Sequence, residues 1–160
     1  MKKKFIKNQG FGLIEIIIGA AIISVGIIAV STSYTIYVQY AFSNERNVEA
    51  TYVIEEGLEA MRFLRDKGWS TNIATLSTSI PYYLTFNGSY WATTTIPQYV
   101  DGQFLRSIDL DDVNRDANDQ IAVSGTLDPN TKKITSTVSY FQGHATTTQS
   151  ISTYISNIRN

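Results

Sequence analysis

The sequence predicts an α+β fold in which a long N-terminal α-helix, membrane-spanning in its first half, packs on a small antiparallel β-sheet head. Residues 11–30 form an apolar run of twenty residues with a single charge, the length that a helix needs to cross a hydrocarbon core of about 30 Å. From about residue 69 the helical period is lost and Thr, Ser, Asn and Tyr dominate. That change is typical of strands joined by turns.

Composition limits the chemistry of the chain. Its 160 residues fit one domain and include no Cys and one His. The lack of Cys excludes disulfides and thiolate metal sites, and a single His excludes zinc sites built from several histidines. His144 has no Ser, Cys or carboxylate at a recognisable catalytic spacing, so we interpret it as a loop residue. The sequence therefore predicts no enzyme.

Basic residues precede the apolar run. Lysines at positions 2, 3, 4 and 7 place residues 1–10 in the cytoplasm by the positive-inside rule, and the chain after about residue 31 on the far side of the membrane.

The one charge inside the run, Glu15, costs about 2.5–3.5 kcal/mol on insertion scales. Its nearest cation, Lys7, lies beyond an i,i+4 contact. We expect another chain to supply the partner; the alternative is a protonated Glu15 without a role.

The lysine-rich leader, Gly10, the pentapeptide FGLIE at residues 11–15 and the apolar run together resemble the N-terminal signature of type IV prepilins and pseudopilins. The resemblance implies that a prepilin peptidase cleaves after Gly10 and methylates the amine of Phe11. It also implies that Glu15 pairs with the terminal amine of a neighbouring subunit during assembly. One departure from the pattern is the proline that many type IV pilins carry in this helix, because the first proline here is Pro81.

Three glycines recur every seven residues in the apolar run, at Gly12, Gly19 and Gly26. This spacing places them near one stripe of the helix, where small residues let helices approach closely. The alternative interpretation is that glycine is simply frequent in membrane helices.

The helix is expected to continue to Lys67, because residues 31–67 contain no proline and Gly68 is suited to end it. A helix over residues 11–67 is about 85 Å long, more than a small head can cover. The part nearest the head carries an apolar stripe, which we expect to pack on the sheet. Its members are Ile54, Leu58, Met61 and Leu64.

The β-rich head is predicted over residues 69–160. Alternation and turn residues predict strands at 82–86, 90–95, 104–113, 121–127, 133–141 and 146–158, with turns at 87–88 and 128–131. The core-facing side is predicted to hold Ile134, Val138, Tyr140, Ile151 and Ile155 or Tyr154. The aromatic residues around Trp91 are interpreted as a packing face, with a sugar- or partner-binding patch as the alternative.

Acidic and amide side chains cluster between residues 109 and 119. Carboxylate and amide oxygens are the ligands that calcium prefers, which makes a non-standard calcium site one interpretation. Ala117 and Val123 stand where a helix-loop-helix calcium site needs glycine and glutamate, so that version is excluded. The alternative is a solvated acidic turn. The candidate ligands are Asp109, Asp111, Asp112, Asn114 and Asp116.

These observations predict a structural subunit of a type IV pilus-like filament, with residues 1–10 removed, 11–30 in the membrane or filament core, and 31–68 continuing the helix outside. Four of the thirteen basic residues lie in the leader, so residues 11–160 carry nine basic and fourteen acidic side chains, a net charge of −5. That charge disfavours nucleic-acid binding. Expected partners are copies of the chain, related pilins, prepilin peptidase and the membrane. The alternatives are a minor pseudopilin of a secretion or DNA-uptake system and a monomeric membrane-anchored binding protein.

Overall fold

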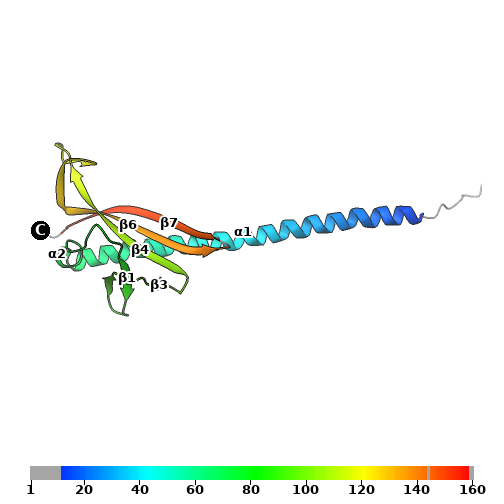
Figure 1. Cartoon of the computed structure of the whole chain (residues 1–160), viewed down its shortest axis with the longest axis horizontal. Coiled ribbons are helices and arrows are strands. Elements are labelled where there is room, and N and C mark those ends of the chain that lie inside the picture. Colours follow the sequence, from blue (N-terminus) through cyan, green and yellow to red (C-terminus); the bar gives the residue numbers. More distant parts are fainter. Residues whose placement is uncertain (1–11, 144, 159–160) are drawn as a thin grey trace, which may run out of the picture. The chain divides into compact units, whose positions relative to one another are not determined.

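A computed structural model describes residues 12–143 and 145–158 of the chain (Figure 1). Two compact units are distinguished within it, Met1–Asn44 and Glu45–Asn160. Each unit is described by itself. The predicted processing residues Gly10 and Phe11, and His144, which we interpret as a loop residue, lie outside the described residues.

Helix α1 spans Leu13–Lys67, 55 residues, which confirms the predicted long helix. It ends where expected, because the N–H of Gly68 donates to the carbonyls of Leu64 and Arg65 at 3.2 and 3.1 Å. In the first unit its large apolar side chains from Leu13 to Phe42 are 47–79% exposed, except for the half-buried Val38. Among the described residues it is the one helix that is long and apolar enough to cross a membrane.

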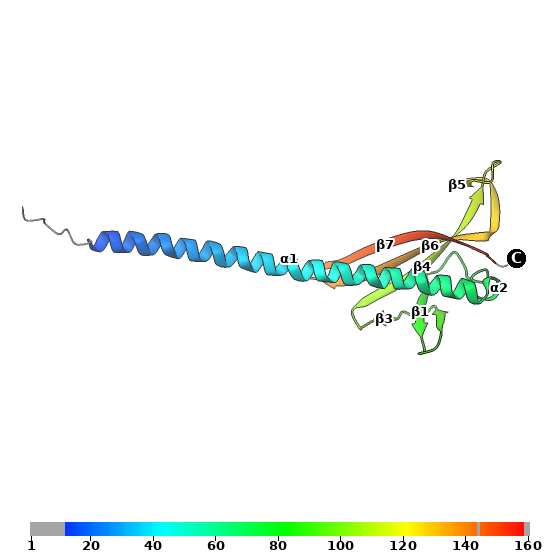
Figure 2. The same ribbon diagram turned by 180° about the vertical axis from the view of Figure 1, so that it is seen from behind.

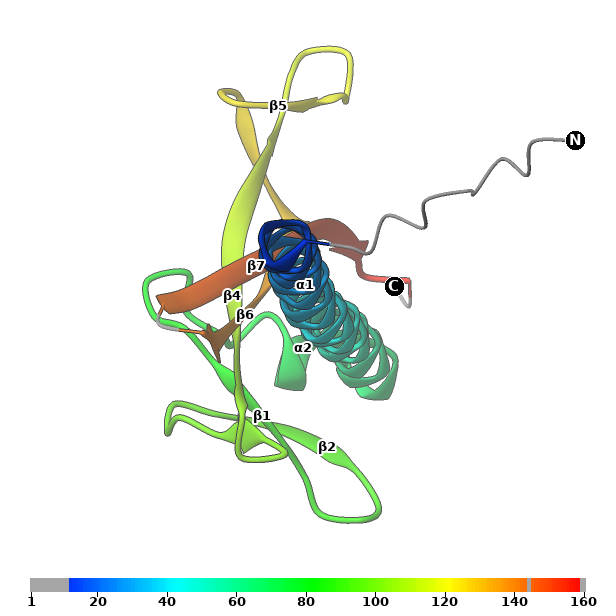
Figure 3. The ribbon, with the colours of Figure 1, turned by 90° about the vertical axis from the view of Figure 1, so that its right-hand side faces the viewer.

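The second unit contains two antiparallel sheets, as the α+β prediction requires. In the larger one the strand order is β3-β4-β6-β7, and β5 pairs with the far end of β4. The smaller one is the hairpin β1–β2, and Figure 3 shows it and β5 at opposite extremes of this unit. The bounds are β1 Tyr83–Phe86, β2 Trp91–Thr94, β3 Tyr99–Val100, β4 Phe104–Arg115, β5 Ile121–Ala122, β6 Thr126–Gln142 and β7 Ala145–Ser156, with a short helix α2 at Trp69–Asn72.

One strand prediction and one turn prediction are wrong. The predicted strand 121–127 is interrupted after β5 (Figure 2). The chain re-enters the sheet through Gly125, where a Cβ would lie 2.1 Å from the carbonyl oxygen of Arg115. The predicted turn at 128–131 lies inside strand β6. There the β4–β6 register shifts, so that Asp112 pairs with Lys132 but Val113 with Asp128. The bulge accommodates Pro129, which has no N–H to donate to a regular ladder.

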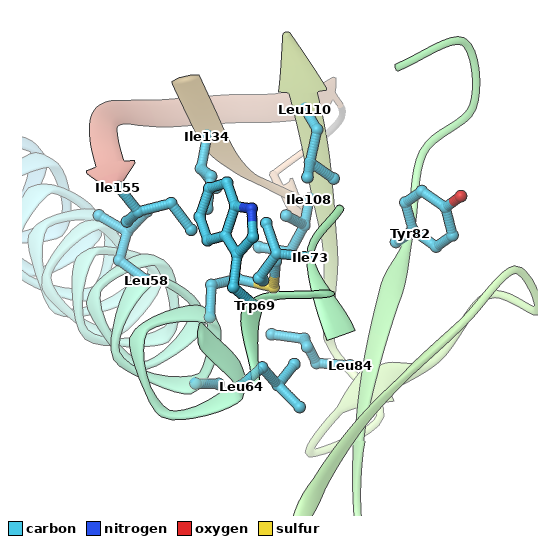
Figure 4. Close-up of a cluster of buried hydrophobic side chains, with 12 residues drawn as sticks. Leu58, Leu64, Trp69, Ile73, Tyr82, Leu84, Ile108, Leu110, Ile134 and Ile155 are labelled. Carbon is cyan, nitrogen blue, oxygen red and sulfur yellow. The ribbon is translucent and has the colours of Figure 1, made fainter. Parts of the chain in front are cut away.

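The apolar stripe of α1 packs on the sheet within the second unit, as predicted. Its four residues are at most 7% exposed. Ile54 lies in a cluster with Phe104, Val138 and Tyr140. The other three form a larger core with residues of β4, β6, β7 and the segment after α1 (Figure 4). Trp69 and Ile73, which the sequence analysis left out of the core, are also buried there. The predicted core residue Ile151 is instead 39% exposed, and of the two alternatives that follow it, Ile155 is buried whereas Tyr154 is 49% exposed.

Polar contacts also hold α1 to the sheet. The buried Arg106 of β4 donates from Nη1 to Glu56 Oε2 at 2.5 Å and to the carbonyl of Val53 at 3.1 Å. Its guanidinium carbon lies 5.4 Å from the ring centroid of Trp91. Nearer the start of this unit, the Tyr140 hydroxyl donates to Asn47 Oδ1 at 2.6 Å. Side-chain hydrogen bonds therefore hold α1 to the sheet at two places, near the start and in the middle of their contact.

Candidate functional site

The first described turn of α1 contains the predicted assembly residue Glu15. Its Oε2 accepts a hydrogen bond from the backbone N–H of Gly12 at 2.8 Å. A carboxylate at this position satisfies one of the amides that a helix N-terminus leaves unpaired, and it also interacts favourably with the helix dipole. Sequence reasoning looked for a cationic partner and missed this one, although the three-residue spacing from Gly12 to Glu15 is that of a capping contact.

The remaining polar side chains of the apolar segment are satisfied within the helix. The hydroxyls of Ser24, Thr32 and Ser33 donate to the carbonyls four residues earlier at 2.8–2.9 Å. An unsatisfied hydroxyl in hydrocarbon is costly, and this back-bonding removes the cost. The outer surface of the segment therefore suits lipid or another apolar helix.

The predicted packing glycines have no close neighbour among the residues that the structure describes. A Cβ at Gly19 or Gly26 would meet nothing within 4 Å, and at Gly12 the nearest atom is Glu15 Oε2 at 3.8 Å. No contact among the described residues requires glycine at these positions. Their role as a close-packing stripe against a second helix stays a prediction.

The acidic candidates are distributed along β4 and the following turn. Asp111 lies 3.4 Å from Lys133 Nζ, and Asp112 pairs with Lys132. Partial burial, followed by repulsion from Asp111, raises the pKa of Asp109. Among the described residues no group of three or more His, Asp or Glu side chains is arranged to hold a metal ion.

The turn after β4 is organised by its own hydrogen bonds. Asp116 Oδ1 accepts the N–H groups of Asn118 and Gln120 at 2.8 and 3.0 Å, bonds that lower the pKa of Asp116, with Gln120 the larger cause. Arg115 Nε donates to Asp128 Oδ2 at 2.6 Å, and that hydrogen bond lowers the pKa of the Asp128 carboxyl. Asn114 Nδ2 lies 3.5 Å from the carbonyl of Val123. Calcium binding stays a prediction.

Comparison with known proteins gives one match. Residues 6–31 match the family model of the prokaryotic N-terminal methylation motif. No curated protein and no solved structure matches the chain significantly. The match covers the end of the leader, the predicted cleavage position and the whole apolar run. This chain carries the type IV pilin and pseudopilin signature at its N-terminus.

Proposed function

We propose that the chain is a structural subunit of a type IV pilus-like filament, made as a membrane-anchored precursor, cleaved after Gly10, methylated on Phe11 and assembled through its N-terminal helix. The observation that carries the proposal is the methylation motif at residues 6–31, which contains the start of a helix whose apolar side chains are open to the surroundings. The motif supports processing by a prepilin peptidase, and the exposed helix supports assembly.

The exposed helix needs a partner that its own chain does not supply among the described residues. All large apolar side chains from Leu13 to Phe42 except Val38 are at least 47% exposed. Burying a side chain of this kind contributes about 1.5–3 kcal/mol. In the precursor, lipid covers residues 11–30, with the leader in the cytoplasm. In the filament, the helices of neighbouring copies replace the lipid, and the head at residues 69–160 faces outward.

Glu15 is suited to select the processed chain for assembly. Its carboxylate is held on Gly12, the residue that follows Phe11 in sequence. Cleavage after Gly10 creates an amine on Phe11, and the amine of a neighbouring copy supplies the cation that a carboxylate in an apolar environment needs. An uncleaved copy has no such amine, so it would leave Glu15 without this partner.

The test is intact mass and N-terminal sequencing of the protein from membranes and from sheared surface material of cells with an active prepilin peptidase. The expected chain begins at N-methylated Phe11 and is present in the sheared fraction. A chain that begins at Met1 and stays in the membrane contradicts the proposal and favours an anchored binding protein. Abundance in the sheared fraction separates a filament-forming subunit from a minor pseudopilin.

A further inference from the structure

Strand β7 forms an edge of the five-stranded sheet without the features that usually protect an edge strand. It is twelve residues long and pairs with β6 in one unbroken register, from Thr131–Ser156 to Gln142–Ala145. Among the described strands only β6 pairs with it, and β7 lies outside β6 in Figures 1 and 2. Its sequence, ATTTQSISTYIS, has no charge, proline or glycine. Edge strands are normally blocked by charges, prolines, bulges or short length.

The opposite edge of the same sheet has the usual protection. Strand β3 is two residues long. After the residues that pair with β3, the outer edge of β4 is exposed as far as the residues that pair with β5. The register of β4 shifts between Asp112 and Val113, and Asp109, Asp111 and Asp112 lie in the part of β4 between its pairings with β3 and β5. The lack of protection is therefore specific to β7.

We propose that the β7 edge is a docking site for an extended segment of a different polypeptide, which adds a strand to the sheet. Backbone N–H and C=O groups along twelve residues would provide the affinity, as in other cases of strand addition. Side chains would provide selectivity. Ile151, on the core-facing side and 39% exposed, favours an aliphatic neighbour, and the exposed hydroxyls of Ser150 and Ser152 on the other side favour small polar ones.

The net charge of the second unit indicates which kind of segment can bind at the β7 edge. Residues 45–160 hold thirteen of the fourteen acidic and nine of the thirteen basic side chains, a net charge of −4. Like charges disfavour an acidic segment near this unit, whereas a neutral or basic one is tolerated or attracted. The expected occupant alternates aliphatic and hydroxyl residues and has no acidic side chain.

A second copy of the chain does not fit this edge, an argument that rests on the proposed function. Helix α1 and β7 run in the same direction, since Asn47 contacts Gln149 at 3.3 Å and Leu58 shares a core cluster with Ile155. If two copies paired their β7 strands antiparallel, so that the two sheets formed one continuous sheet, their α1 helices would also run antiparallel. Copies anchored in one membrane through the same helix run parallel. The other edges of a second copy are strands of two to four residues and the part of β4 between β3 and β5, which carries three aspartates.

The probe is a synthetic peptide with the sequence of residues 131–142, TKKITSTVSYFQ, the segment that already pairs with β7 on its other side. It has the alternation that the site requires and two lysines. The full processed chain in detergent micelles is followed by amide hydrogen exchange with and without peptide. We expect exchange of β7 amides to slow by about tenfold, while β4 amides are unchanged. A peptide with prolines at the positions of Ser136 and Val138 should have no effect.

Ile151→Lys places a charge at the edge and should abolish the protection by the peptide. The matched control is Thr137→Lys on the neighbouring strand β6, which should keep it. Ser150→Lys serves the same purpose if Ile151→Lys fails to fold, as judged by tryptophan fluorescence. Protection that survives both β7 variants, or that the proline peptide also produces, overturns the proposal.

Self-association is read in the same samples by light scattering. A wild-type dimer that Ile151→Lys dissociates would assign the edge to a second copy and overturn the choice of a different polypeptide. Intact mass of each sample reports cleavage after Gly10 independently. Failure of the proposed function and failure of strand addition are therefore distinguishable.

Discussion

Gly57 on α1 faces Ser136 on β6 so closely that a Cβ atom at Gly57 would lie 2.7 Å from Ser136 Oγ. The same atom would lie 2.8 Å from Cδ of Arg106. Glycine inside a helix costs about 1 kcal/mol relative to alanine. The cost is offset here because glycine lets the helix backbone approach the sheet at the centre of the core.

Replacing Gly57 by alanine should lower the free energy of unfolding by about 1 kcal/mol. Overpacking costs about 1–3 kcal/mol and exceeds the gain in helix propensity of about 1 kcal/mol. The measurement is denaturant unfolding of the full chain in micelles, followed by the fluorescence of Trp69 and Trp91, the two tryptophans of the chain. Gly19→Ala is the control, because a Cβ there meets nothing within 4 Å.

Ser136 provides the second arm of this experiment. Its Oγ is buried and has no hydrogen-bond partner among the described residues. Ser136→Ala should therefore raise stability slightly, since a buried unsatisfied hydroxyl costs about 1–3 kcal/mol. The double variant should lose less than the sum of the single effects. Strictly additive effects would show that the close approach of Gly57 and Ser136 is not the cause of the lower stability of Gly57→Ala.

Glu56→Gln should destabilise the second unit by about 1–3 kcal/mol. Arg106 is 3% exposed, and the substitution leaves its buried guanidinium without a carboxylate. The neighbouring exposed residue gives a matched control, because Glu55→Gln removes the same charge and should change stability by less than about 0.5 kcal/mol. The same fluorescence assay applies. Equal losses in the two variants would attribute the effect to net charge rather than to the Arg106 contact.

The long helix and its packing stripe could be predicted because their signals are local and periodic. Apolar length, the absence of proline and the 3.6-residue spacing of Ile54, Leu58 and Met61 depend on the sequence alone. The fold of residues 121–131 could not be predicted, because it depends on the close approach of Gly125 to Arg115 and on a bulge that accommodates Pro129. Both features depend on contacts between different segments of the chain, whereas the turn residues at 128–131 suggested that a strand ends there.

The candidate site divides in the same way. The motif around Glu15 is a sequence signature and was recognised as one. The hydrogen bond from Gly12 was not predicted, because the charge of Glu15 points to a cationic partner rather than to a backbone N–H. The acidic residues near 109–119 show the limit of composition. Whether aspartates converge on an ion or pair with Lys132, Lys133 and Arg115 depends on strand register.

Stability of the second unit should fall as pH drops below the ordinary Asp pKa of 3.8. The pKa of Asp128 is lowered by its hydrogen bond from Arg115, and that of Asp116 by backbone N–H groups. A carboxyl with a lower pKa in the folded state contributes stability that is present above the unfolded pKa and lost as pH falls through the folded one. Asp128→Asn should be less stable at pH 7 and should lose less on acidification. Thermal melts at pH 7 and pH 3 compare the two proteins, and an equal acid loss in both would contradict the role of Asp128.

Two substitutions at Glu15 separate its charge from its capping contact. Glu15→Gln keeps a carbonyl oxygen for the N–H of Gly12 but removes the charge, and Glu15→Leu removes both. We expect both variants to insert, to be cleaved after Gly10 and to be nearly absent from sheared filaments, because the terminal amine of a neighbouring copy then has no carboxylate partner in the apolar core. The measurement is intact mass for cleavage together with the ratio of sheared to membrane protein. Wild-type filament yield from Glu15→Gln with failure of Glu15→Leu would assign the role to helix capping instead, and wild-type yield from both would remove Glu15 from assembly.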